Sequence, residues 1–332
     1  MKILAFGDNL IDPEMLKNGL QAFVDNGDEV VIRDWSHDSV EDLQADNIKV
    51  EQNGANSITI SDPSLLKDID QFDMIITQFT PIGKNLIDRA TNLKYIGVLR
   101  GGMENVDLDY AKSKGIEVMN TAGRNARAVA EFTVGLMLAL TRNIGLMNAK
   151  MHQDIWFKDF PNKNYVPEIG GKTIGIIGFG HIGQMVAGFL KGFGARIIYY
   201  DPYVDKSDIA EKYTDLDELV KEADIISIHM RATKETHHII NQHIFELMGP
   251  NTYFINDARS ALVDEDALIK ALQDHKIAGA ALDTYDNEPL PSDSPLLKLD
   301  NVVLTSHSAG TTADAFRNTP KLFAQRFLAG HK

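Results

Sequence analysis

Two side chains in the second half of the chain have the chemistry to bind and protonate a small acid. Arg259 follows a predicted strand at Thr252–Ile255, and His307 follows another at Val302–Leu304. Open α/β sheets bind ligands at the carboxyl ends of their strands. A guanidinium can bind two carboxylate oxygens at once, and an imidazole can give or take a proton near neutral pH. Taken singly, Arg259 could equally be a surface residue paired with a nearby acid, and His307 could be structural.

A further candidate is the turn Arg100-Gly101-Gly102, which follows the predicted strand Tyr95–Leu99. Two glycines in a row expose backbone N–H groups that can cradle a carboxylate. Arg100 could bind a second anionic group, such as a phosphate, or it could be a solvated loop charge. We therefore predict substrate-binding residues at Arg100, Gly101 and Gly102.

The stretch from Gly178 to Gly183 has the spacing of a dinucleotide-binding loop. It joins a short apolar strand, Thr173–Ile177, to a helical pattern that runs through Leu190. Gly178 would allow the tight turn. Gly180 would let a pyrophosphate approach the backbone, and Gly183 would let the helix pack closely on the strand. The N–H groups that open the helix would face the phosphates; the alternative is a plain strand–helix turn. The predicted cofactor-binding residues are Gly178, Gly180, His181, Ile182 and Gly183.

Asp201 closes the next predicted strand, Arg196–Tyr200, about 20 residues beyond the glycines. A carboxylate there can accept hydrogen bonds from the ribose hydroxyls of NAD and would repel the 2′-phosphate of NADP. The alternative is an aspartate that caps a helix. The sequence therefore predicts NAD as the cofactor.

The bulk composition limits the partners of the chain. It has 332 residues, a formal net charge of −14 and no cysteine. The negative charge disfavours nucleic acid and anionic membranes as partners. Without cysteine there are no disulfides, thiolate catalysis or cysteine metal sites. The N-terminus lacks the pattern of a signal peptide, so we expect a cytoplasmic protein.

Strands and helices alternate along most of the chain, which predicts parallel sheets. Residues 36–68 depart from this pattern, being polar and irregular. There, Val50–Gln52 and Ser57–Ile60 on either side of Asn53-Gly54 suggest a β-hairpin. A predicted helix over Ala128–Met147 is apolar on most faces, so it must be buried between domains or between subunits.

These residues are part of an ordered series of motifs that resembles the D-isomer-specific 2-hydroxyacid dehydrogenase family over roughly residues 70–330. Besides the glycine stretch, the motifs are Asn105-Val-Asp107, Asn120-Thr-Ala-Gly123, Val129-Ala-Glu131, Ile255-Asn-Asp-Ala-Arg259, Leu262-Val-Asp-Glu265, Leu282-Asp-Thr-Tyr-Asp-Asn-Glu-Pro289 and Ser306-His-Ser-Ala-Gly310.

The resemblance implies an α/β fold of two doubly wound parallel-sheet domains. A Rossmann NAD-binding domain at 123–305 would be inserted in a flavodoxin-like substrate domain at 1–122 and 306–332. The implied activity moves a hydride between C4 of nicotinamide and C2 of a 2-keto or D-2-hydroxy acid, and the implied assembly is a homodimer through helix 128–147. The implied catalytic residues are Arg259, Glu288 and His307, and the implied further cofactor contacts are His229, Asp257 and Asp283.

The resemblance also assigns roles to these residues. Arg259 would bind and polarise the substrate, and His307 would be the acid in reduction and the base in oxidation. Glu288 would hydrogen-bond His307, orient its ring and favour its protonated form. Asp283 would lie near the nicotinamide carboxamide.

Several residues depart from the family's pattern. Arg100 stands where a small residue is usual, and His229-Met-Arg231-Ala-Thr233 replaces His-x-Pro-x-Thr. Asp257 replaces a usual threonine and Ser306 a usual proline. None of these removes a catalytic group, but together they leave the substrate and the geometry of the cofactor loops open.

Two other functions are compatible with these motifs. Formate dehydrogenases resemble the chain in the arginine and the histidine, but they use a glutamine where Glu288 stands. A non-catalytic NAD-binding regulator or corepressor would share the fold. We expect no metal site, because His237, His238 and His243 lack a carboxylate partner at the spacing of metal ligands.

Overall fold

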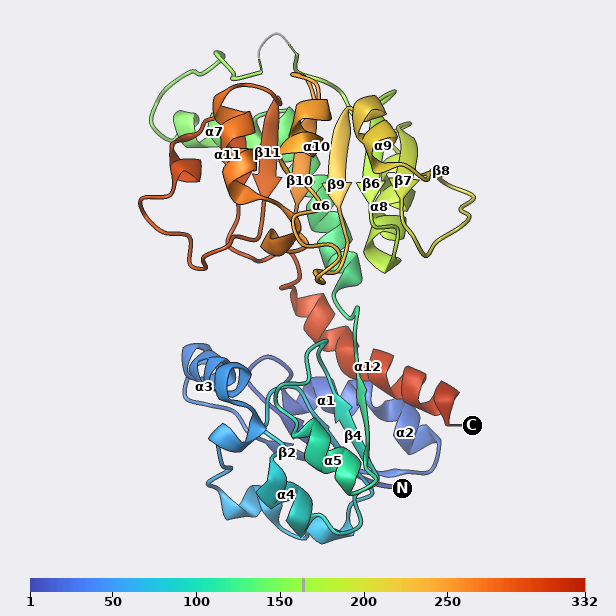
Figure 1. The fold of residues 1–332 in the computed structure, drawn as a ribbon. Coiled ribbons are helices and arrows are strands. Elements are labelled where there is room, and N and C mark those ends of the chain that lie inside the picture. The colour runs from blue at the N-terminus through green and yellow to red at the C-terminus, as the bar shows by residue number, and fades with distance from the viewer. Residues whose placement is uncertain (163–164, 332) are drawn as a thin grey trace. The chain divides into compact units, whose positions relative to one another are not determined.

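The computed structural model describes residues 1–162 and 165–331, which form two compact units (Figure 1). The first unit combines Met1–Arg124 with the C-terminal segment from Thr312, and the second spans Asn125–Thr311. The sequence predicts the division after residue 122 and before residue 306. Residues 306–311, which include His307, therefore lie in the second unit and not in the first.

The first unit is built on a parallel five-stranded sheet. Its strands are β1 (Lys2–Gly7), β2 (Glu29–Asp34), β3 (Met74–Thr77), β4 (Tyr95–Val98) and β5 (Glu117–Asn120). They lie in the order β2-β1-β3-β4-β5, the flavodoxin-like order. The turn that contains Arg100 follows β4, so it lies at the carboxyl edge of this sheet.

Helices cover both faces of this sheet because its buried side chains alternate between them. Ile3 and Ala5 pack toward α1, α2 and α12, whereas Leu4 and Phe6 pack toward α4 and α5. Helix α12 lies so close to β4 that a Cβ at Gly97 would fall 2.2 Å from Phe323. The helices of this unit are α1 (Pro13–Gly19), α2 (Gln21–Asp25), α3 (Val40–Asn53), α4 (Lys84–Arg89), α5 (Leu108–Ser113) and α12 (Ala313–Gly330), with short 3-10 turns η1 (Ala55–Ser57), η2 (Pro63–Leu66) and η3 (Ile69–Gln71).

The predicted hairpin between residues 50 and 60 is wrong, because helix α3 occupies Val40–Asn53. Ser39 caps this helix by accepting a hydrogen bond from the backbone N–H of Asp42. Gly54, with φ of 81°, ends it. The Asn-Gly pair that suggested a hairpin turn is thus the end of a helix.

The second unit is built on a parallel seven-stranded sheet. Its strands are β6 (Thr173–Ile177), β7 (Arg196–Tyr200), β8 (Glu211–Tyr213), β9 (Ile225–Ile228), β10 (Tyr253–Asn256), β11 (Gly279–Leu282) and β12 (Val302–Leu304). Their order is β12-β11-β10-β9-β6-β7-β8. The chain reverses direction across the sheet between β6 and β9, which is where a Rossmann sheet opens its ligand-binding crevice. Together with the first sheet, this order confirms the predicted fold class.

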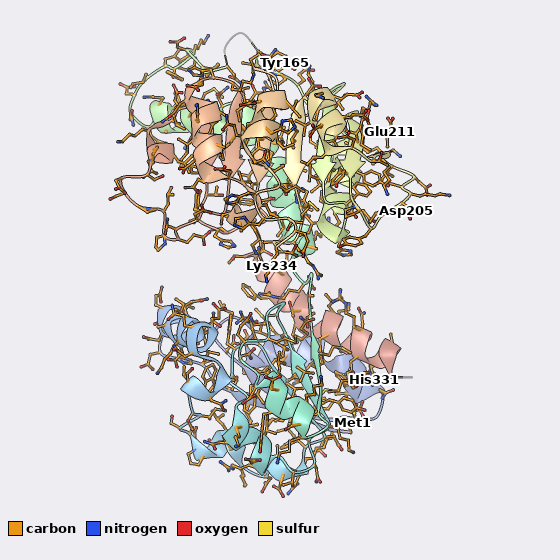
Figure 2. All side chains as sticks on the ribbon, viewed as in Figure 1. Met1, Tyr165, Asp205, Glu211, Lys234 and His331 are labelled. Carbon is orange, nitrogen blue, oxygen red and sulfur yellow. The ribbon has the colours of Figure 1, made fainter. Side chains whose placement is uncertain are left out.

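The helices of the second unit cover the two faces of its sheet in the same alternating way. Tyr253 and Ile255 pack toward α6 and α8, whereas Phe254 packs toward α9, α10 and α11. The edge strand β8 was not predicted; Arg196 on β7 binds Glu211 on β8 at 2.7 Å, and Figure 2 labels Glu211 and Asp205 at this edge. The helices are α6 (Ala126–Thr141), α7 (Ile144–Met151), α8 (His181–Lys191), α9 (Leu216–Glu222), α10 (Gln242–Leu247) and α11 (Glu265–Gln273), with η4 (Ser260–Leu262) and η5 (Pro295–Lys298).

The single helix predicted over Ala128–Met147 is two helices in the structure. Asn143 adopts the left-handed conformation with φ of 54°, which few residues other than glycine and asparagine tolerate, and this ends α6. Helices α6 and α7 meet at a bend of 65°. In the described part of the chain no single helix is long and apolar enough to span a membrane, although these two together pass by length and composition.

Candidate active site

The glycine loop has the geometry that a dinucleotide needs. Gly178 has φ of 92°, and a Cβ there would fall 2.7 Å from the backbone of His229. A Cβ at Gly183 would fall 2.3 Å from the carbonyl oxygen of Gly178, so the helix packs closely on the turn. Gly180, which precedes α8, has no atom within 4 Å of its Cβ position. The loop is therefore closed on its protein side and open at Gly180, beside the N–H groups that begin α8.

Asp201 is tied directly to this loop. Its Oδ2 accepts a hydrogen bond of 2.7 Å from the backbone N–H of Phe179, inside the glycine loop. Its Oδ1 accepts bonds from the N–H groups of Tyr203 and Val204 at 2.7 and 3.0 Å. A carboxylate offers about four acceptor positions, so these three bonds leave one for a ribose hydroxyl.

His307 and Glu288 form a hydrogen-bonded pair in the second unit. Nδ1 of His307 lies 2.7 Å from Oε2 of Glu288, and the two side chains are 49% and 37% exposed. Burial opposes ionisation of Glu288. Hydrogen bonds from His307 and from the N–H of Tyr285, together with the charges of His307 and Arg259, outweigh it, so the pKa of Glu288 lies below its usual value. Glu288 is therefore a carboxylate at neutral pH and accepts the proton of Nδ1.

The loop that carries His307 is fixed by Asp283, which follows β11. Oδ1 of Asp283 accepts hydrogen bonds from the hydroxyl of Thr305 at 2.5 Å and from the N–H of Ser308 at 3.0 Å. Its Oδ2 accepts one of 2.9 Å from the N–H of Ala309. These bonds hold the backbone on both sides of His307, whose φ of 52° is a strained value for this residue. Asp283 is wholly buried, and its predicted contact with the nicotinamide carboxamide stays a prediction.

Tyr285 connects Glu288 to the loop that carries His307, and this role was not predicted from the sequence. Its hydroxyl donates to the carbonyl of Thr305 at 2.7 Å, and its N–H donates to Oε1 of Glu288 at 3.0 Å. Burial raises the pKa of Tyr285 to about 12, so the hydroxyl keeps its proton. The one available signal was its place in the motif between Leu282 and Pro289.

Arg259 is exposed and close to the pair. It follows β10, and the side chain of Asn256 holds the intervening turn by donating to the carbonyl of Arg259 at 3.0 Å and accepting from the N–H of Ala258 at 3.1 Å. The charge of Arg259 contributes to the low pKa of Glu288. The structure therefore brings the three predicted catalytic residues into one region of the second unit.

A cavity of about 820 Å³ opens beside His307 and Glu288, and Arg259 is not among the residues that line it. Its wall includes Glu288 and His307 together with the apolar side chains of Phe132, Leu290 and Leu304. A small organic acid would meet a proton-donating group and apolar surface in the same cavity.

The turn at Arg100 belongs to the first unit. A Cβ at Gly101 would meet no atom within 4 Å, so the backbone is open on that side. Arg100 donates to Oδ1 of Asn47 at 2.6 Å and pairs with Glu51 at 2.5 Å and Glu104 at 3.3 Å. Two carboxylates thus already neutralise Arg100, which disfavours its interpretation as a phosphate-binding residue.

The structure buries the side chains of His229 and Asp257, which the sequence predicted as cofactor contacts. Their exposed fractions are 1% and 0%, and Nδ1 of His229 lies 3.7 Å from Oδ1 of Asp257. Nε2 of His229 is 2.9 Å from the hydroxyl of Ser227. Burial lowers the pKa of His229 to about 4 and raises the pKa of Asp257 to about 7. Both residues are therefore packed beneath the carboxyl edge of the sheet instead of lining its surface.

The histidines after β9 form other contacts. His237 and His238 stack on each other at 3.9 Å, and His243 binds Asp217 at 2.8 Å. Within residues 1–162 and 165–331, no three His, Asp or Glu side chains are grouped as metal ligands would be.

Comparisons with known proteins agree with this geometry. The profile of the family described as D-isomer specific 2-hydroxyacid dehydrogenase, NAD binding domain, matches residues 134–309. A glyoxylate reductase of Thermofilum pendens is 41% identical over 274 residues, which cover 80% of each chain. A D-3-phosphoglycerate dehydrogenase of Methanocaldococcus jannaschii is 38% identical over 86% of this chain, which spans only 55% of that enzyme.

The fold is also that of a solved structure. The NAD complex of a D-isomer specific 2-hydroxyacid dehydrogenase from Lactobacillus delbrueckii ssp. bulgaricus aligns with a TM-score of 0.78 and 28% identity. The alignment covers 100% of this chain and 97% of that chain.

Proposed function

The chain belongs to the D-isomer-specific 2-hydroxyacid dehydrogenase family, and from that premise we propose that it catalyses reversible hydride transfer between NADH and a small 2-keto acid. It is an NAD-dependent oxidoreductase that acts on the CH–OH group of its donor. The observation that carries the proposed reaction is the 2.7 Å hydrogen bond between His307 and Glu288 at the cavity wall.

His307 supplies the proton in the proposed reaction. A carboxylate can only accept hydrogen bonds, so Glu288 fixes the proton of His307 on Nδ1. Nε2 is then the ring atom that gains or loses a proton, and it gives that proton to the carbonyl oxygen during reduction. In oxidation, neutral Nε2 takes the hydroxyl proton. The hydrogen bonds of Asp283 and Tyr285 hold the backbone around His307 in place for both steps.

Arg259 binds the substrate carboxylate in this proposal. Its fork of N–H groups can bind two oxygens, and its positive charge polarises the adjacent carbonyl. The binding of a substrate carboxylate by the amides of Gly101 and Gly102 stays a prediction.

The glycine loop fits the cofactor of this family. The open side of Gly180 and the first N–H groups of α8 suit the pyrophosphate, and the free acceptor position of Asp201 suits the ribose. When bound, the nicotinamide supplies or accepts the hydride.

The substrate we propose is an unphosphorylated 2-keto acid. The pairing of Arg100 with Glu51 and Glu104 supports this choice, as do the relatives named glyoxylate reductase and hydroxypyruvate reductase. The test is turnover of NADH with a panel of glyoxylate, hydroxypyruvate, pyruvate and a phosphorylated 2-keto acid. Turnover confined to the phosphorylated acid would refute the substrate class. Formate oxidation, or NAD binding without turnover of any acid, would refute the reaction.

We expect the enzyme to prefer NADH over NADPH. Asp201 would repel a 2′-phosphate, so kcat/KM measured with each cofactor should favour NADH, and Asp201→Ala should weaken NADH use. Because Asp201 also holds the N–H of Phe179, Asp201→Asn serves as a control: it removes the charge and keeps an acceptor oxygen. Equal kcat/KM for both cofactors in the parent would contradict this prediction.

We also propose a homodimer that forms through the region of α6 and α7. Helix α6 is mostly buried within its own unit, but Ile144, Met151 and Ile155 remain 50%, 50% and 43% exposed, and Trp156 is 76% exposed. Light scattering at micromolar concentration should give twice the chain mass of 36.8 kDa. Trp156→Arg should shift the protein toward monomer, whereas Val24→Arg, at an exposed apolar position in the first unit, should not. A monomer mass for the parent would rule the dimer out.

A further inference from the structure

Asp257 lies in a buried polar cluster that the proposed reaction does not use. The cluster consists of Asp257 after β10, His229 after β9 and Thr133 on α6, with Asp283 after β11 close enough to raise the pKa of Asp257 by its charge. Of the residues that the structure describes, His229 and Asp283 are the titratable groups that face Asp257 from the neighbouring strands, and α6 contributes the hydroxyl of Thr133. Asp257 thus sits between groups that do not supply a positive charge at neutral pH, because the buried imidazole has a pKa of about 4.

The hydrogen bonds of Thr133 indicate that Asp257 carries a proton. Oγ1 of Thr133 lies 2.8 Å from the carbonyl oxygen of Val129 and 2.5 Å from Oδ2 of Asp257. A hydroxyl has one hydrogen to donate and two lone pairs to accept with. Both contacts are satisfied when Thr133 donates to Val129 and a protonated Asp257 donates to Thr133.

The other carboxyl oxygen, Oδ1, lies 3.7 Å from Nδ1 of His229, which is too far for a hydrogen bond. Among the described residues, neither Oδ1 of Asp257 nor Nδ1 of His229 makes a hydrogen bond, although both atoms are buried. An ionised Asp257 would therefore be a buried negative charge with few hydrogen bonds, and such a charge responds strongly to any new charge nearby.

The position of Asp257 in the sheet indicates which charge could come near it, namely that of the nicotinamide ring. A Rossmann sheet consists of two mononucleotide-binding halves, and β9, β10 and β11 form the half that follows the crevice, opposite the half that begins with the glycine loop. The nicotinamide half of the cofactor belongs to this second half, and its ring is cationic when oxidised and neutral when reduced.

We propose that Asp257 is a proton-binding group coupled to the redox state of the bound cofactor. It keeps its proton when the reduced cofactor binds, and it releases that proton to the solvent when the oxidised, cationic ring binds. One proton leaves the carboxyl group, and one negative charge remains to attract the ring. The enzyme thereby favours NAD⁺ over NADH more strongly as the pH rises. This inference rests on cofactor binding and not on the proposed substrate, so either can fail without the other.

The test is the ratio of the dissociation constants of NADH and NAD⁺ between pH 5.5 and 8.5, measured by cofactor fluorescence and by competition. The ratio should rise roughly three- to tenfold over this range in the parent, the scale of a strongly screened charge–charge interaction. It should stay constant in Asp257→Asn and in Asp257→Thr, which restores the residue usual in the family. Asp293→Asn removes an exposed charge of the same unit and should behave as the parent. The series is repeated with His307→Asn, so that the exposed imidazole does not contribute.

Calorimetry in buffers of different ionisation enthalpy gives a second readout. NAD⁺ binding near neutral pH should release a fraction of a proton from the His307→Asn protein and none from the same protein with Asp257→Asn. NADH binding should release none from either. A ratio that is flat with pH in the parent, or that rises equally in the Asp257 variants, would overturn the proposal.

Urea unfolding of Asp257→Asn shows whether this variant is folded and how its stability depends on pH. Burial raises the pKa of Asp257 from 3.8 to about 7, so the native state holds a proton that the unfolded chain has lost between these values. The stability from this group is present below pH 3.8 and is lost as the pH rises to about 7. The stability of Asp257→Asn relative to the parent should therefore increase as the pH rises from 5 to about 7 and stay constant above that.

Discussion

Replacing His307 by asparagine is expected to lower kcat by roughly 10²- to 10⁴-fold in both directions, the usual contribution of a positioned general acid–base group. Asparagine is the informative replacement because the backbone at this position is left-handed, with φ of 52°. Asparagine tolerates that conformation, whereas alanine would strain the loop. The variant should therefore melt within a few degrees of the parent and bind NADH with the parental dissociation constant. Parental kcat in this folded variant would show that another group moves the proton.

The pH dependence of kcat/KM tests the role of Glu288 separately from that of His307. Reduction needs a protonated imidazole, so kcat/KM for the keto acid should fall as the pH rises; oxidation needs a neutral imidazole, so its kcat/KM should fall as the pH drops. Glu288→Gln removes the charge that attracts the proton. Both midpoints should then move to lower pH, because the imidazolium has lost the carboxylate that stabilised it. If both midpoints stay at the parental pH, Glu288 is an ordinary solvated acid.

Arg259→Lys is expected to lower kcat/KM for the keto acid by at least about tenfold, the scale of one lost charge-assisted contact. Lysine keeps the positive charge beside Glu288 but loses the fork that binds two oxygens. The pH midpoints should therefore stay in place while kcat/KM falls, which separates substrate anchoring from tuning of the His307–Glu288 pair.

Arg317→Lys is the matched control for that experiment. Arg317 is exposed and pairs with Asp314 at 2.8 Å on α12, so the same substitution there should leave both kcat and KM unchanged. Parental kinetics in the Arg259→Lys variant would instead move the anchoring role to another cation, with Arg100 as the first to test.

The parts of the fold that depend on local pattern could be predicted from the sequence. The strand, glycine turn and helix around Gly178 follow from apolar β-branched residues and from a backbone that only glycine tolerates. Helix α3 was missed because it is polar, with only Leu43, Asn47 and Val50 buried. Its one clear signal was the cap formed by Ser39.

The failure to predict helix α3 affected the interpretation of Arg100. Arg100 stayed open between a phosphate ligand and a loop charge, because its partner Glu51 lies on α3 and 49 residues away in the chain. Similarly, the sequence placed Asp283 at the right strand end, but not its three bonds to the loop of His307, which depend on tertiary contacts. Pattern identifies which residues reach the edge of a sheet, whereas their partners come from segments far apart in sequence.

The bond between Asp201 and the N–H of Phe179 links coenzyme selectivity to the order of the glycine loop. A change of preference from NADH to NADPH would require loss of this acid, because its charge would repel the 2′-phosphate. In this protein that single change would also free a buried N–H in the loop that we propose binds the pyrophosphate. A productive route therefore has two steps: a neighbouring side chain must first supply a substitute acceptor for Phe179, and only then can the acid be lost. The order of these substitutions is constrained, and variants that first replace Asp201 by a residue without an acceptor oxygen should bind both coenzymes poorly.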